Sequence, residues 1–287
     1  MTNSGTGPAG PPSGSAPAPQ SYTCPWCSTT STGTSLSCPA CGAAVNVKAV
    51  TTHSGWIELP GAKDMARIQF GASTCQIEGN YVPVADLNLA PEARVYFTHH
   101  VLLWKDPQVT LDTLPLQGGW NRLLAGMPLI MLQAHGPGHI AFSRDAPGEM
   151  VALPLHAGQA VDVREHVFMV ATGEIAYSWF SVYPLVTNLD RFYAQSAPGL
   201  LLLHGAGNVF IRHLAPKQTI LVKAGALLFK DAAVEMRLTT EYVGRSGPVG
   251  TAYGSTWGER YHWLRLYGPG RVAVQSAAKG IDELVAS

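Results

Sequence analysis

The stretch Met150–Tyr177, MVALPLHAGQAVDVREHVFMVATGEIAY, decides the fold because the chain contains it three times. It aligns without a gap with Val84–Leu111, which lies 66 residues earlier, and with Val209–Met236, which lies 59 residues later. In each copy, apolar residues alternate with polar ones on both sides of a short turn. Alternation with a period of two is typical of β-strands that bury one face. The sequence therefore predicts three copies of one strand-turn-strand unit.

A second pattern accompanies the first. Gly136–Ala141 resembles Gly268–Ala273, and Gly205–Phe210 is a weaker third copy. Each is interpreted as a Gly-x-Gly turn that opens a return strand. Because such a repeat cannot bury its apolar face alone, we expect the three to share one core. The predicted fold is all-β, a sandwich or prism of three internal repeats packed around a common pseudo-threefold axis over residues 66–277.

Composition limits the classes of partner. The 287 residues are 46% hydrophobic and 13% charged, and 19 basic residues balance 19 acidic ones. A neutral chain lacks the broad positive surface that binds nucleic acid or anionic membranes. No apolar run approaches the roughly 18 residues that span a bilayer, and no secretory signal is readable at the N-terminus. We expect a cytoplasmic protein with protein partners of unknown identity; peripheral membrane association and homo-oligomerisation stay open.

The segments outside the repeats differ in composition. Residues 1–20 are Gly, Pro, Ser, Ala and Thr with almost nothing to bury, which predicts a disordered tail. Residues 48–65 are interpreted as a linker, and residues 278–287 as a C-terminal tail.

A small module over residues 21–47 carries four cysteines in two C-x-x-C pairs, separated by ten residues; they are Cys24, Cys27, Cys38 and Cys41. Each pair can turn two thiolates onto one ion, and two pairs complete a tetrahedral S₄ shell. The pattern predicts a zinc ribbon, with iron as the chemical alternative. Four thiolates leave no open coordination position, so one structural zinc ion is expected rather than a catalytic one.

The histidines are the serious catalytic candidates. His99 and His100 occupy the same repeat column as Glu165 and His166, while Ala224-Gly225 fills it in the third copy. Two imidazoles and a carboxylate would suit a cupin-like metal enzyme or a small-ligand binder. Adjacent strand residues point to opposite faces, however, so a tight turn between two strands explains the column better.

Other chemical motifs are absent or incomplete. Gly254–Gly258 has its serine one place early for a nucleophile elbow, and Gly205–Phe210 lacks the third glycine of a dinucleotide fingerprint. Cys75, in an apolar strand context, is expected to be an inert buried thiol. Tyr253 and Trp257, in a Gly-rich connector, are the candidates for an exposed contact patch.

Several stretches match a known family; they include ARIQFGAS (66–73), GPGHIAFS (136–143), GLLLLHGAG (199–207) and GPGRVAVQS (268–276). Together with the repeat unit they resemble the altered-inheritance-of-mitochondria protein 24-like family. The resemblance implies a β-sandwich similar to the tryptophan RNA-binding attenuator protein. It also implies a link of the mitochondrial members to inner-membrane organisation. It implies no catalytic residues, and the cysteine ribbon is an addition that many relatives lack.

The function expected from the sequence is a non-enzymatic scaffold or interaction protein that binds zinc through its ribbon. The alternative is the metal-dependent enzyme or ligand binder that would use His99 or His100 with His166. RNA binding, by analogy with the attenuator fold, is a second alternative that the neutral charge disfavours.

Overall fold

The computed structural model describes residues 21–24, 29–32, 38–40, 54–58, 68–79, 81–114, 131–182, 187–243 and 259–277. The predicted tails at residues 1–20 and 278–287, and most of the linker at 48–65, lie outside these ranges. The described residues form antiparallel β-sheets almost throughout. The all-β prediction is therefore confirmed.

Each repeat contributes six strands among the described residues. Repeat 1 consists of β6 (Val84–Leu89), β7 (Arg94–Thr98), β8 (Leu102–Lys105), β9 (Thr110–Thr113), β10 (Met131–His135) and β11 (Gly138–Ser143). Repeat 2 consists of β12 (Glu149–Leu155), β13 (Ala160–Arg164), β14 (Phe168–Thr172), β15 (Ile175–Val182), β16 (Thr187–Ala194) and β17 (Gly199–Gly205). Repeat 3 consists of β18 (Val209–Leu214), β19 (Thr219–Lys223), β20 (Leu227–Asp231), β21 (Glu235–Val243), β22 (Glu259–Tyr267) and β23 (Gly270–Gln275).

The three repeats share one topology. In each, the sixth strand lies between the first and the third, and the fifth lies between the second and the fourth. The third strand also carries a β-bulge in the same column each time, at Leu103, Met169 and Leu228. Because the bulge recurs at a matching place, the sequence repeat is a repeat of backbone geometry, as predicted.

Two joints connect the repeats. β7 of repeat 1 pairs with β14 of repeat 2, and β13 of repeat 2 pairs with β20 of repeat 3. The first joint sets Phe97 opposite Val170, and the second sets Val163 opposite Phe229. These pairs occupy matching columns of the repeat, so both joints use one register. The first joint merges half of repeat 1 and half of repeat 2 into a six-stranded sheet. The second joint merges the other half of repeat 2 and half of repeat 3 into a seven-stranded sheet, which also includes the added strand β3 (Ile57–Glu58).

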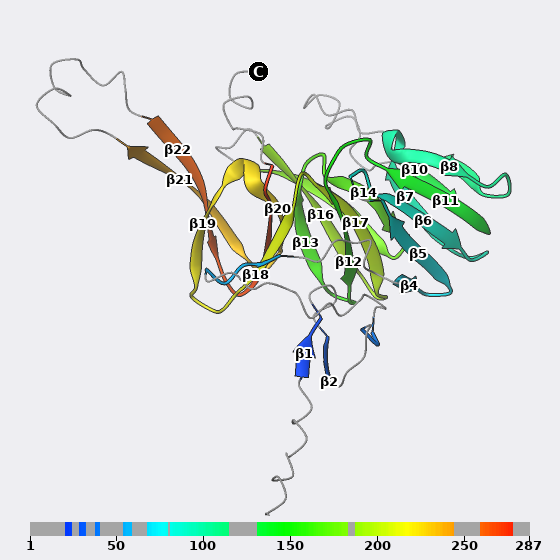
Figure 1. Ribbon diagram of the computed structural model, residues 1–287, viewed down its shortest axis with the longest axis horizontal. Coiled ribbons are helices and arrows are strands. Elements are labelled where there is room, and N and C mark those ends of the chain that lie inside the picture. Colours follow the sequence, from blue (N-terminus) through cyan, green and yellow to red (C-terminus); the bar gives the residue numbers. More distant parts are fainter. Residues whose placement is uncertain are drawn as a thin grey trace, which may run out of the picture.

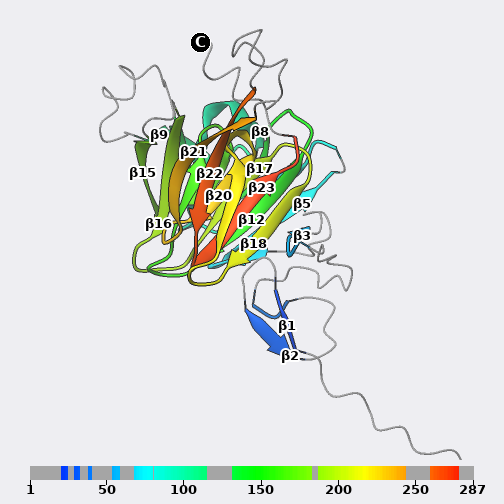
Figure 2. The ribbon, with the colours of Figure 1, turned by 90° about the vertical axis from the view of Figure 1, so that its left-hand side faces the viewer.

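The repeats lie in a row rather than around one axis. Figure 1 shows repeat 3 at one end, repeat 2 in the middle and repeat 1 at the other end, and Figure 2 views the row from the repeat 3 end. A closed pseudo-threefold arrangement would pair β19 with β8, but these strands lie at opposite ends of the row. The expected common axis is therefore wrong. The reason is physical: each joint adds the next repeat at a sheet edge and leaves the far edge open.

Three further described strands lie outside the repeats and extend two of the sheets. β4 (Ile68–Phe70) and β5 (Ser73–Glu78) continue the sheet beyond β6, and β3 (Ile57–Glu58) pairs with β18. The main core fills the interior of repeats 1 and 2 and reaches into repeat 3. At its centre the Phe97 and Phe142 rings lie 4.8 Å apart. A smaller apolar cluster lies within repeat 3, around Leu266 and Val272.

The return strand of repeat 2 corrects one prediction. Ala197-Pro198-Gly199, not Gly205–Phe210, opens this strand, because β17 begins at Gly199. Gly205 instead ends β17, just before the turn that leads into β18. The sequence comparison missed the true copy because alanine replaces the first glycine of the motif.

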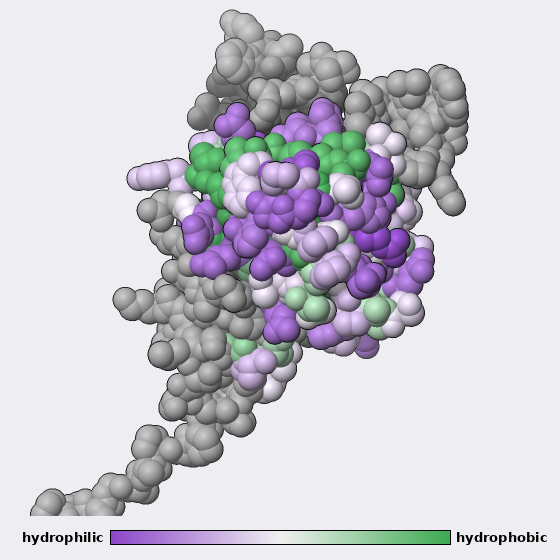
Figure 3. All heavy atoms as spheres, turned by 90° about the vertical axis from the view of Figure 1, so that its right-hand side faces the viewer, coloured by the Kyte–Doolittle hydropathy of each residue, from purple (hydrophilic) through white to green (hydrophobic). Residues whose placement is uncertain are grey.

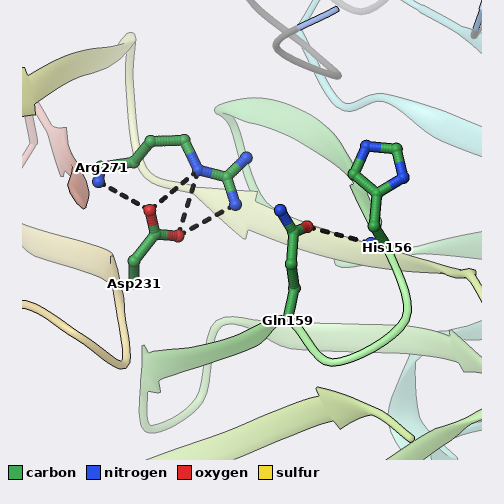
Figure 4. Close-up of polar contacts among 4 residues, drawn as sticks. All are labelled: His156, Gln159, Asp231 and Arg271. Atoms are coloured by element: carbon green, nitrogen blue, oxygen red, sulfur yellow. Dashed lines mark hydrogen bonds and ion pairs between the residues drawn. The ribbon is translucent and has the colours of Figure 1, made fainter. Parts of the chain in front are cut away.

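One hydrogen bond anchors the start of every return strand. The Asp106 carboxylate accepts the His139 N–H at 2.9 Å, the Thr172 hydroxyl accepts the Leu200 N–H at 3.2 Å, and the Asp231 carboxylate accepts the Arg271 N–H at 2.7 Å. In repeat 3 the guanidinium of Arg271 also binds Asp231, as Figure 4 shows. Aspartate in repeats 1 and 3 and threonine in repeat 2 thus accept the equivalent backbone hydrogen bond.

A second recurring bond closes the turn between the first and second strands. Gln159 accepts the His156 N–H at 2.9 Å (Figure 4), and Gln218 accepts the Ala215 N–H at 3.0 Å. In repeat 1 the Ser73 hydroxyl of β5 takes this role toward Ala90. The short turn predicted in each copy of the repeat is therefore held by a hydrogen bond.

Candidate functional site

The N-terminal module is described in part. β1 (Ser21–Thr23) and β2 (Thr30–Thr32) form an antiparallel hairpin, and the Cys24 N–H donates to the Thr29 carbonyl at 3.0 Å. The first C-x-x-C pair therefore lies between the two hairpin strands in the sequence. Cys24 and Cys38 are both buried, with 2% and 1% of their surface exposed.

The rest of the predicted zinc site cannot be placed. Cys27 and Cys41 lie outside the described residues. In the described part of the chain, no group of three or more His, Cys, Asp or Glu residues is arranged to hold a metal ion. Because the described residues include only half of the predicted ligands, the zinc site stays a prediction.

The histidine column forms tight turns. His99 and His100 belong to the 3₁₀ helix η2 (His99–Val101), which connects β7 to β8, and their rings lie 5.5 Å apart. Glu165 and His166 make the equivalent turn between β13 and β14, where His166 has a φ of 69°. In repeat 3 the column is η3 (Ala224–Ala226). The turn interpretation is therefore confirmed.

The turns of repeats 1 and 2 nevertheless lie close enough to interact. Burial lowers the pKa of His100, and the charges of Arg144, His99 and His166 lower it further. Burial also lowers the pKa of Arg144, whose Nη1 is buried with no hydrogen-bond partner among the described residues. A guanidinium beside His100 repels a metal cation, so this cluster favours an anion or neutral imidazoles over a metal site.

A buried histidine borders the cluster. His204 is 5% exposed, and its Nε2–H donates to the Ala146 carbonyl at 3.0 Å. Burial lowers the pKa of His204; the hydrogen bond to Ala146 opposes this shift and the charge of Arg144 adds to it. Burial in the fold therefore favours the neutral form of the ring.

The second joint contains a buried ionic group that the sequence reasoning missed. Asp162, fully buried, accepts hydrogen bonds from Arg191 at 2.6 Å and from Lys230 at 2.6 Å. Burial alone would raise the pKa of Asp162, but the bonds to the two cations outweigh it and lower the pKa. By the alternating pattern alone, Asp162 would lie on a solvent-exposed face of its strand. A strand that is paired along both edges and covered on both faces leaves no such face.

The other residues singled out in the sequence are Cys75, Tyr253 and Trp257. Cys75 is completely buried, as expected, and burial raises its pKa. Tyr253 and Trp257 lie outside the described residues, so their contact patch stays a prediction. Among the described residues, the large apolar side chains left exposed are Tyr81, Val82, Leu103, Trp104, Leu221 and Tyr261.

Fold and site together define an all-β protein of three repeats joined through shared sheets, with a cysteine hairpin at its N-terminal side. The family model described as "Mitochondrial biogenesis AIM24" matches residues 75–277, and the chain belongs to that family. The chain is also similar in fold to protein SPYM3_0169 from Streptococcus pyogenes, whose crystal structure is known. The TM-score is 0.53 and the identity 18%, over 75% of this chain and 97% of the other.

No curated protein matches the chain. In the part of the chain that the structure describes, no helix is both long and apolar enough to cross a bilayer.

Proposed function

We propose that the protein is a non-enzymatic scaffold whose repeats hold contact surfaces in place and whose N-terminal ribbon binds one structural zinc ion. The observation that carries this proposal is the division of roles within the repeat. Positions that agree in all three copies are buried apolar residues and turn anchors, whereas the polar candidates His99, His166 and Glu165 differ from copy to copy. Residues that differ between copies do not form a repeated catalytic site.

The ribbon supports the zinc part of the proposal. A module of this size has too small a core to fold on apolar burial alone, so a bound metal would supply its folding free energy. The buried Cys24 and Cys38 and the hairpin around the first cysteine pair fit such a module. Four thiolates would leave the ion no position for substrate.

Metal analysis of the full-length protein tests the ribbon. We expect one zinc ion per chain, lost in Cys24→Ser and in Cys38→Ser. Cys75→Ser is the matched control, because Cys75 is buried in β5, away from the ribbon in the sequence, and it should keep the metal. Zinc that survives both ribbon substitutions contradicts the proposal.

A second experiment separates scaffold from enzyme. The full-length protein and Cys24→Ser are each used as bait in an extract of the source cell, and the captured proteins are compared. Loss of specific partners with the substitution supports contact through the ribbon. The metal-enzyme alternative instead predicts a second metal equivalent that His166→Ala removes. Specific turnover of a metabolite that His166→Ala abolishes would overturn the scaffold proposal.

A further inference from the structure

The two ends of the row carry the two halves of a joint. At each internal joint, the second strand of one repeat pairs with the third strand of the next. Two strands of these types have no such partner among the described strands: β8, the third strand of repeat 1, and β19, the second strand of repeat 3. Both are edge strands, at opposite ends of the molecule (Figure 1).

Two side chains on β8 are exposed at positions that are buried on the other third strands. Leu103 and Trp104 are 56% and 43% exposed. Their counterparts on the other third strands are buried to 1% exposure or less; these are Met169 and Val170 in β14 and Leu228 and Phe229 in β20. Figure 3 shows an apolar band on the end of the molecule that repeat 1 forms.

The other edge behaves in the same way. Leu221 of β19 is 41% exposed, whereas its counterparts Tyr96 in β7 and Asp162 in β13 are 5% and 0% exposed. An apolar residue that protrudes from an edge strand is a site for pairing with another chain.

At both edges, the backbone N–H and C=O groups that a joint would use point toward the open side. The Gly268 N–H donates to the Gln218 carbonyl, so Gln218 faces β22, and the alternation of a strand turns the amide of Leu221 toward the open edge. On β8 the Asp106 N–H donates to the His139 carbonyl, so Lys105 faces the open edge. The backbone bonding groups of Leu221 and Lys105 thus stand where a paired joint needs them.

We propose that β19 of one copy pairs antiparallel with β8 of a second copy, so that the chain assembles head to tail. Applying the register shared by both internal joints gives the facing pairs Val222–Trp104, Leu221–Lys105 and Ile220–Asp106. A head-to-tail contact of this kind closes into a ring or continues as a filament, according to the rotation per copy. The proposal uses strand pairing alone and does not depend on the zinc or scaffold proposal.

The side chains at the new joint resemble those of the second internal joint. There, Asp162 is held by Arg191 across β16 and by Lys230 across the joint. The matching positions at the new joint are Leu221, Arg265 across β22 and Lys105 of the second copy. Both cations are present, and the carboxylate alone is replaced by leucine.

One position departs from the internal joints. Gly173 donates its N–H to Arg94 at the first joint, and Ala232 donates to Ala160 at the second. The matching residue beyond β8 is Pro107, which has no N–H. The new joint therefore has one backbone hydrogen bond fewer, which predicts a weaker and concentration-dependent contact.

Light scattering and native mass spectrometry of the full-length protein over a concentration series test the proposal. We expect species at multiples of the 30.5 kDa chain. Leu221→Lys sets two lysines opposite each other and should raise the concentration for half-association about tenfold or more. Leu221→Asp completes the ionic group and should keep or strengthen association. Tyr81→Lys, at a side chain 82% exposed and away from both edges, is the control and should change nothing.

A charge exchange tests the direction of pairing. Lys105→Asp added to Leu221→Lys restores an opposite pair across the joint and should restore association. A symmetric contact between two β19 strands would not be rescued in this way. The proposal is overturned by a protein that stays monomeric at every concentration, by equal effects of Leu221→Lys and Tyr81→Lys, or by a folded double variant that stays dissociated. If the double variant does not fold, a loss of association in Leu221→Asp overturns the proposal.

Discussion

The two internal joints share one backbone register and differ in the side chains at its centre. At the first joint Tyr96 faces Ala171, and at the second Asp162 faces Lys230. The tyrosine packs on Phe168 with ring centroids 5.7 Å apart, while the aspartate is held by two cations. An apolar pair and an ion pair therefore support the same strand pairing. The two joints therefore have the same backbone pairing and differ in their central side chains.

The central side chains also differ in whether their buried polar groups have partners. The Tyr96 hydroxyl is buried with no hydrogen-bond partner among the described residues, and burial, followed by the charge of Asp190, raises its pKa. The Asp162 carboxylate, by contrast, is bound by two cations, Arg191 and Lys230. A satisfied buried ion pair costs much to break and little to replace as a unit, whereas an unsatisfied hydroxyl costs little to remove. The two joints should respond oppositely to small changes.

The largest predicted effect comes from breaking the ionic group. Asp162→Ala leaves Lys230, 4% exposed, without its carboxylate, and should lower the free energy of unfolding by about 3–5 kcal/mol. Urea denaturation measures the change. Tyr96→Phe, in the same column of the first joint, removes the unsatisfied hydroxyl and should be neutral or slightly stabilising. Equal losses in both variants would show that the two joints do not differ as described.

The next largest loss of stability is expected at the bulge position of the third strands. This position is buried in β14 and β20 and exposed in β8. Met169→Ala and Leu228→Ala remove fully buried side chains and should each cost about 2–5 kcal/mol. Leu103→Ala, at the same bulge on β8, should change the unfolding free energy of the monomeric protein by less than about 0.5 kcal/mol. Denaturation at a concentration below self-association makes the comparison. A large loss at Leu103 would show that β8 is covered within its own chain.

The contrast between joints also explains what the sequence could reveal. The repeat, the strand pattern and the turns were predictable, because alternation and turn residues are local signals. The ionic group of Asp162 was not predictable, because its partners Arg191 and Lys230 lie 29 and 68 residues away and only the fold brings them together. The open row was missed for a related reason: three equal copies predict joints, but whether the last joint closes depends on the rotation at each one.

A smaller effect is expected when the second joint receives the side chains of the first. Asp162→Tyr with Lys230→Ala removes both buried charges together, and Arg191, whose side chain is 39% exposed, can turn to solvent. The double variant should regain at least about half of the stability lost in Asp162→Ala, because a buried ion pair can often be replaced by apolar residues without loss. A double variant less stable than Asp162→Ala would mean that this joint requires its charges.

Mild acid should affect the first joint before the second. His204 and His100 border the first joint, and their pKa values are lowered from the ordinary 6.5, so the unfolded chain binds protons that the fold does not. Their contribution to stability is complete above about pH 6.5 and is lost as the pH falls below it. The pKa of Asp162 is lowered from 3.8, so its contribution persists through mild acid and is lost only as the pH falls through the folded value.

Thermal unfolding measured between about pH 7.5 and pH 5 tests this order. We expect the melting temperature to fall across the range in the wild-type protein. The fall should be smaller in His204→Gln, whose amide can still donate to the Ala146 carbonyl but does not titrate. The Asp162→Tyr, Lys230→Ala variant should keep the wild-type fall, because the second joint does not titrate in this range. If that variant lost the pH dependence instead, the acid-sensitive groups would lie at the second joint, and the assignment of His204 would be wrong.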